Sequence, residues 1–197
     1  MKYVVRKIER SELFRKLIHM SGFTVPFIAR SIGVAYTSLI ILAVTALYAV
    51  SELLRLKGYS FPIITTITLS AAREQEIKSY MWKPVYFALG ILIPLLIFPK
   101  PINYATITIL TLGDGVASLA GKLVGGIQLP FNLRKTFEGT LTGFLFALTG
   151  AMTFVSPFLA VIGAVAGMAV EGLPLRIDDN LTVALGSGFA MVLASLI

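Results

Sequence analysis

The sequence contains no cysteine and a single histidine, His19, among its 197 residues. Disulfides, thiolate metal sites and a cysteine nucleophile are therefore excluded, and so is a metal site built from several histidines. The chain also lacks a Gly-x-x-x-x-Gly-Lys-Ser/Thr segment, which excludes a P-loop enzyme.

Charge is scarce as well, because only 14% of the residues are charged. Typical soluble domains carry about 25%. Hydrophobic residues make up 56% of the chain, and a surface that faces water on all sides cannot be assembled from this composition. The net charge of +7 does not indicate nucleic-acid binding, since apolar runs separate the basic residues and leave no continuous polar face.

Long apolar stretches are what the sequence does have. A helix that spans a bilayer needs about 20 mostly apolar residues, and seven stretches meet or approach this length. We therefore predict an all-α, polytopic transmembrane helical bundle of about seven spans, folded as one domain, with one interfacial helix within Ser60–Lys83. The expected spans are Leu17–Ile32, Val34–Leu54, Pro84–Pro99, Ile102–Val124, Phe137–Val155, Pro157–Leu173 and Leu181–Ile197.

The distribution of charge predicts an orientation. With a retained N-terminus in the cytoplasm, every basic residue except Arg30 and Lys100 falls on the inner side. The ten acidic residues fall on the same side, which orientation alone does not explain. The expectation is a multi-pass integral membrane protein with a cytoplasmic active site and an external C-terminus. If the first stretch is re-entrant, six spans remain.

The first polar cluster lies inside an apolar stretch and contains Asp114. A carboxylate at the centre of a membrane helix costs about 2.5 to 3.5 kcal/mol, which favours a functional role. On a continuous helix Asp114, Ser118 and Lys122 share one face that suits a metal ion and phosphate. The flanking Gly113 and Gly115 favour close approach of a ligand. The alternative is a structural link between Asp114 and Lys122 at a helix crossing.

A second cluster stands where the fifth predicted span begins. Arg134 and Lys135 precede Thr136, and the backbone N–H groups at a helix start bind anions, so this segment predicts a phosphate site. Glu138 fits such a site only if a cation neutralises it. The alternative makes Arg134 and Lys135 interfacial anchors and Glu138 a first-turn carboxylate favoured by the helix dipole.

The third cluster joins the last two predicted spans. Glu171, Asp178, Asp179 and Asn180 bring three carboxylates and an amide within ten residues, and Mg²⁺ prefers such oxygen ligands together with phosphate. Asp178 through Asn180 are equally suited to a helix N-cap followed by a solvated loop.

Further charged residues lie near the first two predicted spans. Arg15, Lys16 and His19 lie at helical spacing, and Glu52 and Arg55 end the second span on the same side. His19 is a candidate for proton transfer or a hydrogen-bonded structural group. Glu52 and Arg55 are candidate accessory residues, and the alternative makes Lys16 and Arg55 anchors to lipid headgroups.

Taken in order along the chain, these segments resemble the dolichol kinase and phytol kinase family of CTP-dependent lipid-alcohol kinases. The resemblance covers most of the chain. The segments that carry it are Arg15-Lys16-Leu17-Ile18-His19, Ser51-Glu52-Leu53-Leu54-Arg55, Gly113-Asp114-Gly115 through Gly121, Lys135-Thr136-Phe137-Glu138-Gly139 and Asp179-Asn180-Leu181-Thr182.

The resemblance implies transfer of the γ-phosphoryl group of CTP to the hydroxyl of a polyprenol-type isoprenoid alcohol, with Mg²⁺ as cofactor. It implies catalytic roles for Asp114, Lys135, Glu138 and Asp179. On this hypothesis the ligands of Mg²⁺ are Asp114, Asp178 and Asp179, with Asn180 orienting the ion. The triphosphate is bound by Lys122, Lys135, Arg134, Ser118 and Thr136. Gly121, Gly125 and Gly139 allow close approach of the phosphates and of neighbouring helices, and Glu171 is a reserve base or metal ligand. The hydrocarbon chain is expected among Phe144, Leu145, Phe146 and Met168.

Three other functions remain open. A CTP-dependent lipid cytidylyltransferase needs similar acids, bases and a membrane groove, although its late Lys-Asp and Pro-Gly-His-Gly-Gly-like signature is absent here. A small transporter would use buried carboxylates as ion relays, but they would be spread through the membrane depth. A structural membrane subunit would explain glycine packing and positive-inside charge but not the clustered acids.

Overall fold

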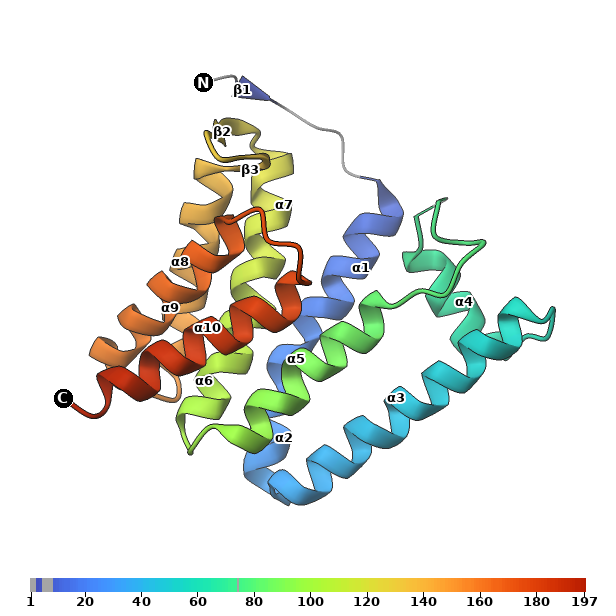
Figure 1. Cartoon of the computed structure of the whole chain (residues 1–197), viewed down its shortest axis with the longest axis horizontal. Coiled ribbons are helices and arrows are strands. Elements are labelled where there is room, and N and C mark those ends of the chain that lie inside the picture. The colour runs from blue at the N-terminus through green and yellow to red at the C-terminus, as the bar shows by residue number, and fades with distance from the viewer. Residues whose placement is uncertain (1–2, 5–8, 74) are drawn as a thin grey trace.

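The computed structural model describes residues 3–4, 9–73 and 75–197, and it is mostly helical (Figure 1). The longer helices pack against one another, and the C-terminus follows α10 at one edge of the molecule. The helices are α1 (Arg10–Ser21), the 3-10 helix η1 (Gly22–Thr24), α2 (Val25–Ile32), α3 (Val34–Leu56), α4 (Pro62–Ala71), α5 (Lys83–Ile97), α6 (Ile102–Thr108), the π-helix η2 (Ile109–Asp114), α7 (Gly115–Leu123), α8 (Phe137–Ala151), α9 (Pro157–Gly172) and α10 (Asp179–Ala194).

A small antiparallel sheet corrects the all-α prediction. Its strands β1 (Tyr3–Val4), β2 (Gly126–Leu129) and β3 (Asn132–Thr136) lie in the order β1-β2-β3. Gly125 and Gly126 adopt positive φ angles of 71° and 149° directly after α7, which lets the chain turn into β2. The sequence analysis missed the hairpin because its strands are short and carry no regular alternation of apolar and polar residues.

Five of the predicted helical stretches correspond to single helices, namely α3, α5, α8, α9 and α10, with ends that differ by a few residues. The first predicted stretch is instead divided among α1, η1 and α2. Of the described residues within Ser60–Lys83, α4 forms a helix and Lys83 begins α5. The described residues 72–73 and 75–82 are irregular and are termed segment 72–82 below. The stretch Ile102–Val124 contains three helix types in succession, α6, η2 and α7.

The seven-span arrangement is not confirmed. Within the described residues one helix, α3, is long and apolar enough to cross a membrane, and only 11% of its apolar window is buried. The apolar helices α4, α5, α9 and α10 are shorter, with 10 to 17 residues. Length and composition therefore single out α3, which lies along the outer side of α5 (Figure 1).

The core surrounds α6 and η2, where Ala105, Ile107, Ile109 and Leu110 are fully buried. Helices α8, α9 and α10 pack against this segment. The backbones of α7 and α8 lie close together, since a Cβ atom on Gly139 would stand 2.7 Å from the carbonyl oxygen of Ala117. This packing fixes the end of η2 relative to the hairpin that precedes α8.

Candidate functional site

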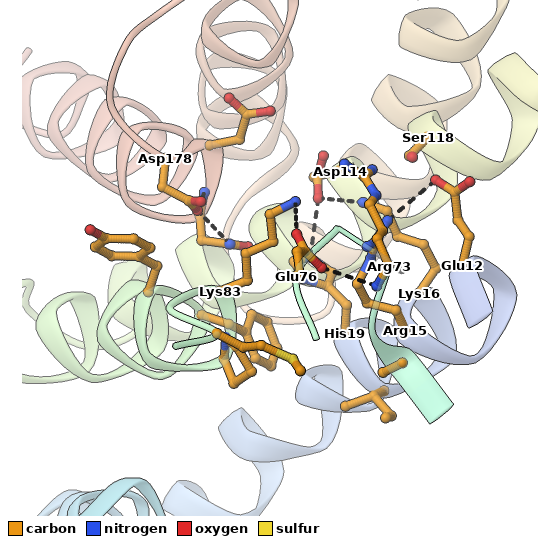
Figure 2. A pocket seen from close by; sticks show the side chains of 18 of the residues that line it. Glu12, Arg15, Lys16, His19, Arg73, Glu76, Lys83, Asp114, Ser118 and Asp178 are labelled. Atoms are coloured by element: carbon orange, nitrogen blue, oxygen red, sulfur yellow. Dashed lines mark hydrogen bonds and ion pairs between the residues drawn. The ribbon is translucent and has the colours of Figure 1, made fainter. Parts of the chain in front are cut away.

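A cavity of about 1130 Å³ opens where the three polar clusters of the sequence meet (Figure 2). Its wall contains residues of α1, α3, α4, α5, α7, the β2–β3 hairpin, α8, α9 and the start of α10, together with the irregular segment 72–82. The sequence-predicted residues on this wall are His19, Asp114, Ser118, Gly121, Lys122, Arg134, Lys135, Thr136, Glu171, Asp178, Asp179 and Asn180.

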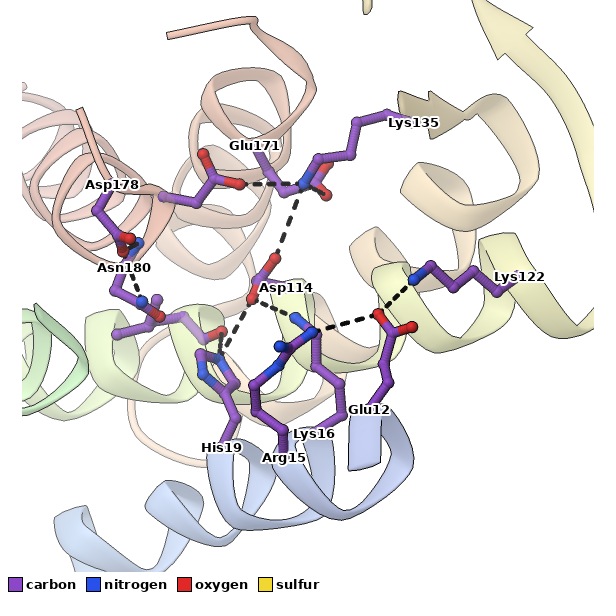
Figure 3. A network of polar contacts seen from close by, with 12 residues as sticks. Glu12, Arg15, Lys16, His19, Asp114, Lys122, Lys135, Glu171, Asp178 and Asn180 are labelled. Atoms are coloured by element: carbon purple, nitrogen blue, oxygen red, sulfur yellow. Dashed lines mark hydrogen bonds and ion pairs between the residues drawn. The ribbon is translucent and has the colours of Figure 1, made fainter. Parts of the chain in front are cut away.

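Asp114 is the most contacted carboxylate of the cavity and is only 5% exposed. Its Oδ2 atom lies 2.9 Å from Nζ of Lys16 and 3.5 Å from Nε2 of His19. Its Oδ1 atom lies 3.9 Å from Nζ of Lys135 (Figure 3). The ring of His19 also contacts the carbonyl oxygen of Leu110 at 3.1 Å, which ties α1 to η2. A buried carboxylate is tolerated here because cationic side chains surround it.

Lys135 links the three polar clusters. It extends from β3 and contacts Glu171 on α9, Asp179 at the start of α10 at 3.2 Å, and Asp114. Burial by itself lowers the pKa of Lys135, but Asp114, Glu171 and Asp179 outweigh burial and raise that pKa above the usual lysine range. Lys135 is therefore a cation held between carboxylates from three separate segments.

Lys122 and the start of α1 form another part of the cavity wall. Lys122 forms an ion pair with Glu12, and Arg15 lies 3.4 Å from the same carboxylate (Figure 3). One guanidinium nitrogen of Arg15, Nη1, is buried and lacks a hydrogen-bond partner among the described residues. Asp114, Ser118 and Lys122 thus line one cavity, as predicted. Asp114 and Lys122 do not pair with each other, because each forms an ion pair with a residue of α1.

Two residues of the site act as helix caps. The Thr136 hydroxyl accepts a hydrogen bond from the backbone N–H of Gly139, and Oδ1 of Asp178 accepts hydrogen bonds from the backbone N–H and the Nδ2 amide of Asn180. The N-cap interpretation of Asp178 thus describes its contacts in this structure. Both capped helix starts open onto the cavity, so capping and lining are compatible.

Glu138, Gly113 and Gly115 are not among the described residues that line the cavity. The Glu138 carboxylate accepts a hydrogen bond of 2.8 Å from the backbone N–H of Ile127, and among the described residues it is not part of the cavity wall. This hydrogen bond is possible because residue 126 is a glycine, since a Cβ atom there would stand 1.9 Å from Oε2 of Glu138. Gly113 and Gly115 are likewise at helix contacts, against Ala147 and Met168 and against Met20, respectively.

Glu52 and Arg55 form what we term the Glu52–Arg55 clamp. Arg55 donates two hydrogen bonds to Glu52, of 2.7 and 2.8 Å, and further ones to the carbonyl oxygens of Ile77 and Ser79. Glu52 accepts a hydrogen bond from the backbone N–H of Met81. The clamp holds segment 72–82 against α3, and that segment carries Arg73 and Glu76 onto the cavity wall.

Several charged residues of the wall were not predicted as site residues, namely Glu12, Arg15, Lys16, Arg73, Glu76 and Lys83. Lys83 lies 3.6 Å from Glu76, and both side chains line the cavity (Figure 2). The helical spacing of Arg15, Lys16 and His19 was a usable signal for α1. Arg73, Glu76 and Lys83 gave none, because a charged irregular segment resembles a solvated surface in sequence.

Comparison with known proteins identifies relatives along nearly the whole chain. It is 26% identical over 214 residues to a probable phytol kinase 1 of Oryza sativa subsp. japonica, which covers 95% of this chain and 66% of the rice protein. It is 24% identical to phytol kinase 1 of Arabidopsis thaliana, over 96% of this chain and 68% of that protein. The farnesol kinase of Arabidopsis thaliana is 32% identical over 61% of this chain and 45% of its own length.

Along most of its length the chain is similar to phytol kinases. It spans two thirds or less of the length of most of these curated relatives, all of which are named as chloroplastic. No protein-family model matches the chain, and no solved structure matches it.

The side chains of the described residues do not by themselves form a metal site. Among the described residues no three histidine, aspartate or glutamate side chains converge to hold an ion. Asp114 and Asp179 lie on either side of Lys135, so a lysine occupies the position between the two predicted ligands. Mg²⁺ often binds through one or two carboxylates plus substrate phosphates, and Asp179, with a side chain 39% exposed, is suited to such a shared site.

Proposed function

We propose that this chain is a lipid-alcohol kinase that transfers the γ-phosphoryl group of CTP to the hydroxyl of an isoprenoid alcohol. The main support for the proposal is that one cavity is lined by both charged and apolar side chains. Its wall combines lysine, arginine and aspartate side chains from α1, α7, β3 and α10 with apolar side chains from α3, α4 and α5. A phosphate-bearing molecule and a hydrocarbon chain can therefore meet in the same space. The names of the relatives, phytol kinase and farnesol kinase, agree with this pairing.

The chemistry suits the residues. In the reaction the bond between the γ-phosphorus and the bridging oxygen breaks, a bond from the alcohol oxygen to that phosphorus forms, and the hydroxyl proton is lost. Lipid monophosphate and CDP are the products. Phosphoryl transfer depends mainly on positioning and on neutralising oxygen charge. Lys16, Lys135 and Arg134 supply positive charge on the wall, and Asp114 holds the first two near one another.

Mg²⁺ enters this proposal as part of the nucleotide substrate. The phosphate oxygens of the nucleotide would supply most of the ligands of the ion, and the partly exposed carboxylate of Asp179 would add one more. When bound, the ion neutralises charge on the transferring phosphoryl group. Lys135 then orients Asp179 and Glu171 while remaining charged.

The proposal places the protein in a membrane, because an isoprenoid alcohol resides in the bilayer. Helix α3 has the length and apolarity of a span. Numerous large apolar side chains on the other helices are exposed as well, among them Leu96, Phe158 and Leu193 at 58 to 65%. We infer a multi-pass arrangement with the N-terminus and the cavity mouth on the cytoplasmic side, in accord with the positive-inside bias.

The decisive experiment uses purified protein, Mg²⁺ and CTP labelled separately at the α- and γ-phosphates, with phytol, farnesol, a polyprenol and phosphatidate as acceptors. We expect γ-label in a lipid monophosphate and release of CDP. Transfer of α-label with release of pyrophosphate would instead establish a cytidylyltransferase. ATP, GTP and UTP in parallel reactions decide whether CTP is the preferred donor, and absence of transfer from every donor would contradict a kinase.

A further inference from the structure

The cavity has a compartment, which we term the apolar arm, that the phosphate chemistry does not use. Within the described residues, α3 and α4 contribute no charged side chain to the cavity wall, whereas α1, α7, β3, α9 and α10 contribute most of the charges. The charged side chains thus come mainly from elements other than α3 and α4, although Lys83 at the start of α5 also lines the cavity. The apolar arm is lined by Val44, Leu47, Ile64, Ile67, Trp82 and Phe87.

Several side chains of the apolar arm are exposed. Leu47 is 50% exposed, Ile67 45% and Trp82 55%, although all three line the cavity. Helix α3 is also the one helix of the described chain with the length and apolarity of a membrane span. A hydrocarbon chain can therefore enter from a bilayer beside α3 and reach the arm without passing through water.

The cavity is large enough to hold a hydrocarbon chain beside a phosphate-bearing group. Its volume of about 1130 Å³ exceeds the range of about 300 to 1,000 Å³ that holds a single drug-sized molecule. The helices expected from the sequence to hold the hydrocarbon chain contribute little apolar surface to the wall, since among the described residues α8 adds only Thr140 and α9 only Glu171. Leu145 lies on α8 away from the wall and is 51% exposed.

We propose that the apolar arm between α3, α4 and α5 binds the hydrocarbon chain of the acceptor alcohol and selects its length. The hydroxyl then lies toward Asp114 and Lys135, at the charged end of the same cavity. This inference rests on the proposed kinase function. It assigns chain selection to Leu47 and Ile67, not to the surface formed by α8 and α9.

Substitution of the two exposed arm residues tests the assignment. An indole at either position fills the arm, so Leu47→Trp and Ile67→Trp exclude long chains more than short ones. We expect the ratio of kcat/KM for phytol to that for geraniol to fall by roughly tenfold or more, as for other hydrophobic pockets that lose space. Leu145→Trp is the matched control, because Leu145 is as exposed as Leu47, and it should leave the ratio unchanged.

An unchanged ratio in both arm variants, or a shift caused by Leu145→Trp alone, would overturn the assignment while leaving the kinase function intact. Photolabelling with a diazirine-bearing farnesol analogue, followed by peptide mapping, gives a readout that needs no turnover. Label within residues 44–67 and its loss in Leu47→Trp support the arm, and label confined to residues 141–168 excludes it. If the wild-type protein phosphorylates no alcohol, the kinase proposal fails, whereas the labelling still decides where the hydrocarbon chain binds.

Discussion

The Nζ atom of Lys16 lies 2.9 Å from Oδ2 of Asp114, although 98 positions of the sequence separate the two residues. The side chain of Lys16 is 12% exposed and that of Asp114 is 7% exposed. The pair joins α1 to the end of η2. Removing Lys16 would leave the buried Asp114 carboxylate with only His19 and the more distant Lys135 beside it, which is costly in a protein interior.

The first prediction concerns this pair. Lys16→Met should lower the free energy of unfolding by about 3 to 5 kcal/mol, because it leaves the Asp114 carboxylate buried and poorly paired. The double variant Lys16→Met with Asp114→Asn should lose less than the sum of the single losses, by about 0.5 to 3 kcal/mol. Denaturation in detergent micelles measures all three, and Arg10→Met, at the exposed start of α1, serves as the control. Simple additivity of the two substitutions would contradict the pairing.

The second prediction concerns Lys135 and pH. Its folded pKa is raised above the unfolded value, so its stabilising contribution is fully present below the unfolded lysine value of about 10.4 and is lost as pH rises through the folded pKa. The difference in unfolding free energy between wild type and Lys135→Met should therefore stay constant between about pH 7 and pH 9. Turnover of Lys135→Met should fall roughly 100-fold or more, since a cation near the phosphate is lost. A stability difference that shrinks within that pH window would show that Lys135 is not held by its carboxylates.

The third prediction tests whether Glu138 has a structural or a catalytic role. Because this carboxylate accepts a hydrogen bond from the backbone N–H of Ile127, Glu138→Gln retains an acceptor and should keep most of the activity. Glu138→Ala leaves that N–H without its partner and should lower stability by about 1 to 3 kcal/mol. Parallel thermal unfolding and kinase assays distinguish the roles. Equal loss of turnover in both variants with unchanged stability would restore a catalytic role.

The fourth prediction concerns the Glu52–Arg55 clamp. Lysine cannot reproduce the fork with which Arg55 binds Glu52 and two carbonyl oxygens, so Arg55→Lys should release segment 72–82. Amide hydrogen exchange in residues 75–82 should become faster, and turnover should fall several-fold as Arg73 and Glu76 lose their positions. Arg30→Lys, at an exposed position of α2, controls for the chemistry of the substitution. Unchanged exchange in residues 75–82 would show that the clamp does not hold the segment.

Much of the local structure could be predicted because it depends on local composition. The apolar runs gave α3, α5, α8, α9 and α10 with small errors at their ends, since runs of this length without internal charge favour helices. The hairpin and the irregular segment 72–82 escaped prediction. Their residues carry no regular apolar pattern, and their conformations depend on contacts with Glu138 and Arg55, respectively.

The candidate site could likewise be predicted only in part. The sequence singled out Asp114, Lys135, Asp179 and Glu171, because charged residues beside apolar runs need a reason to be there. It could not show that Lys135 stands between the three carboxylates, or that Lys122 pairs with Glu12 and not with Asp114. Partners far apart in the chain meet only after the helices have packed.

The sequence by itself determined the helical, apolar character of the protein, the set of charged segments and the resemblance to lipid-alcohol kinases. These properties follow from composition and order along the chain. Tertiary structure decided which charges form pairs, which glycines serve helix contacts, and which helices border the apolar part of the cavity. The physical reason is that ion pairing and enclosure act through space over a few ångströms, so they depend on helix packing and not on position in the sequence.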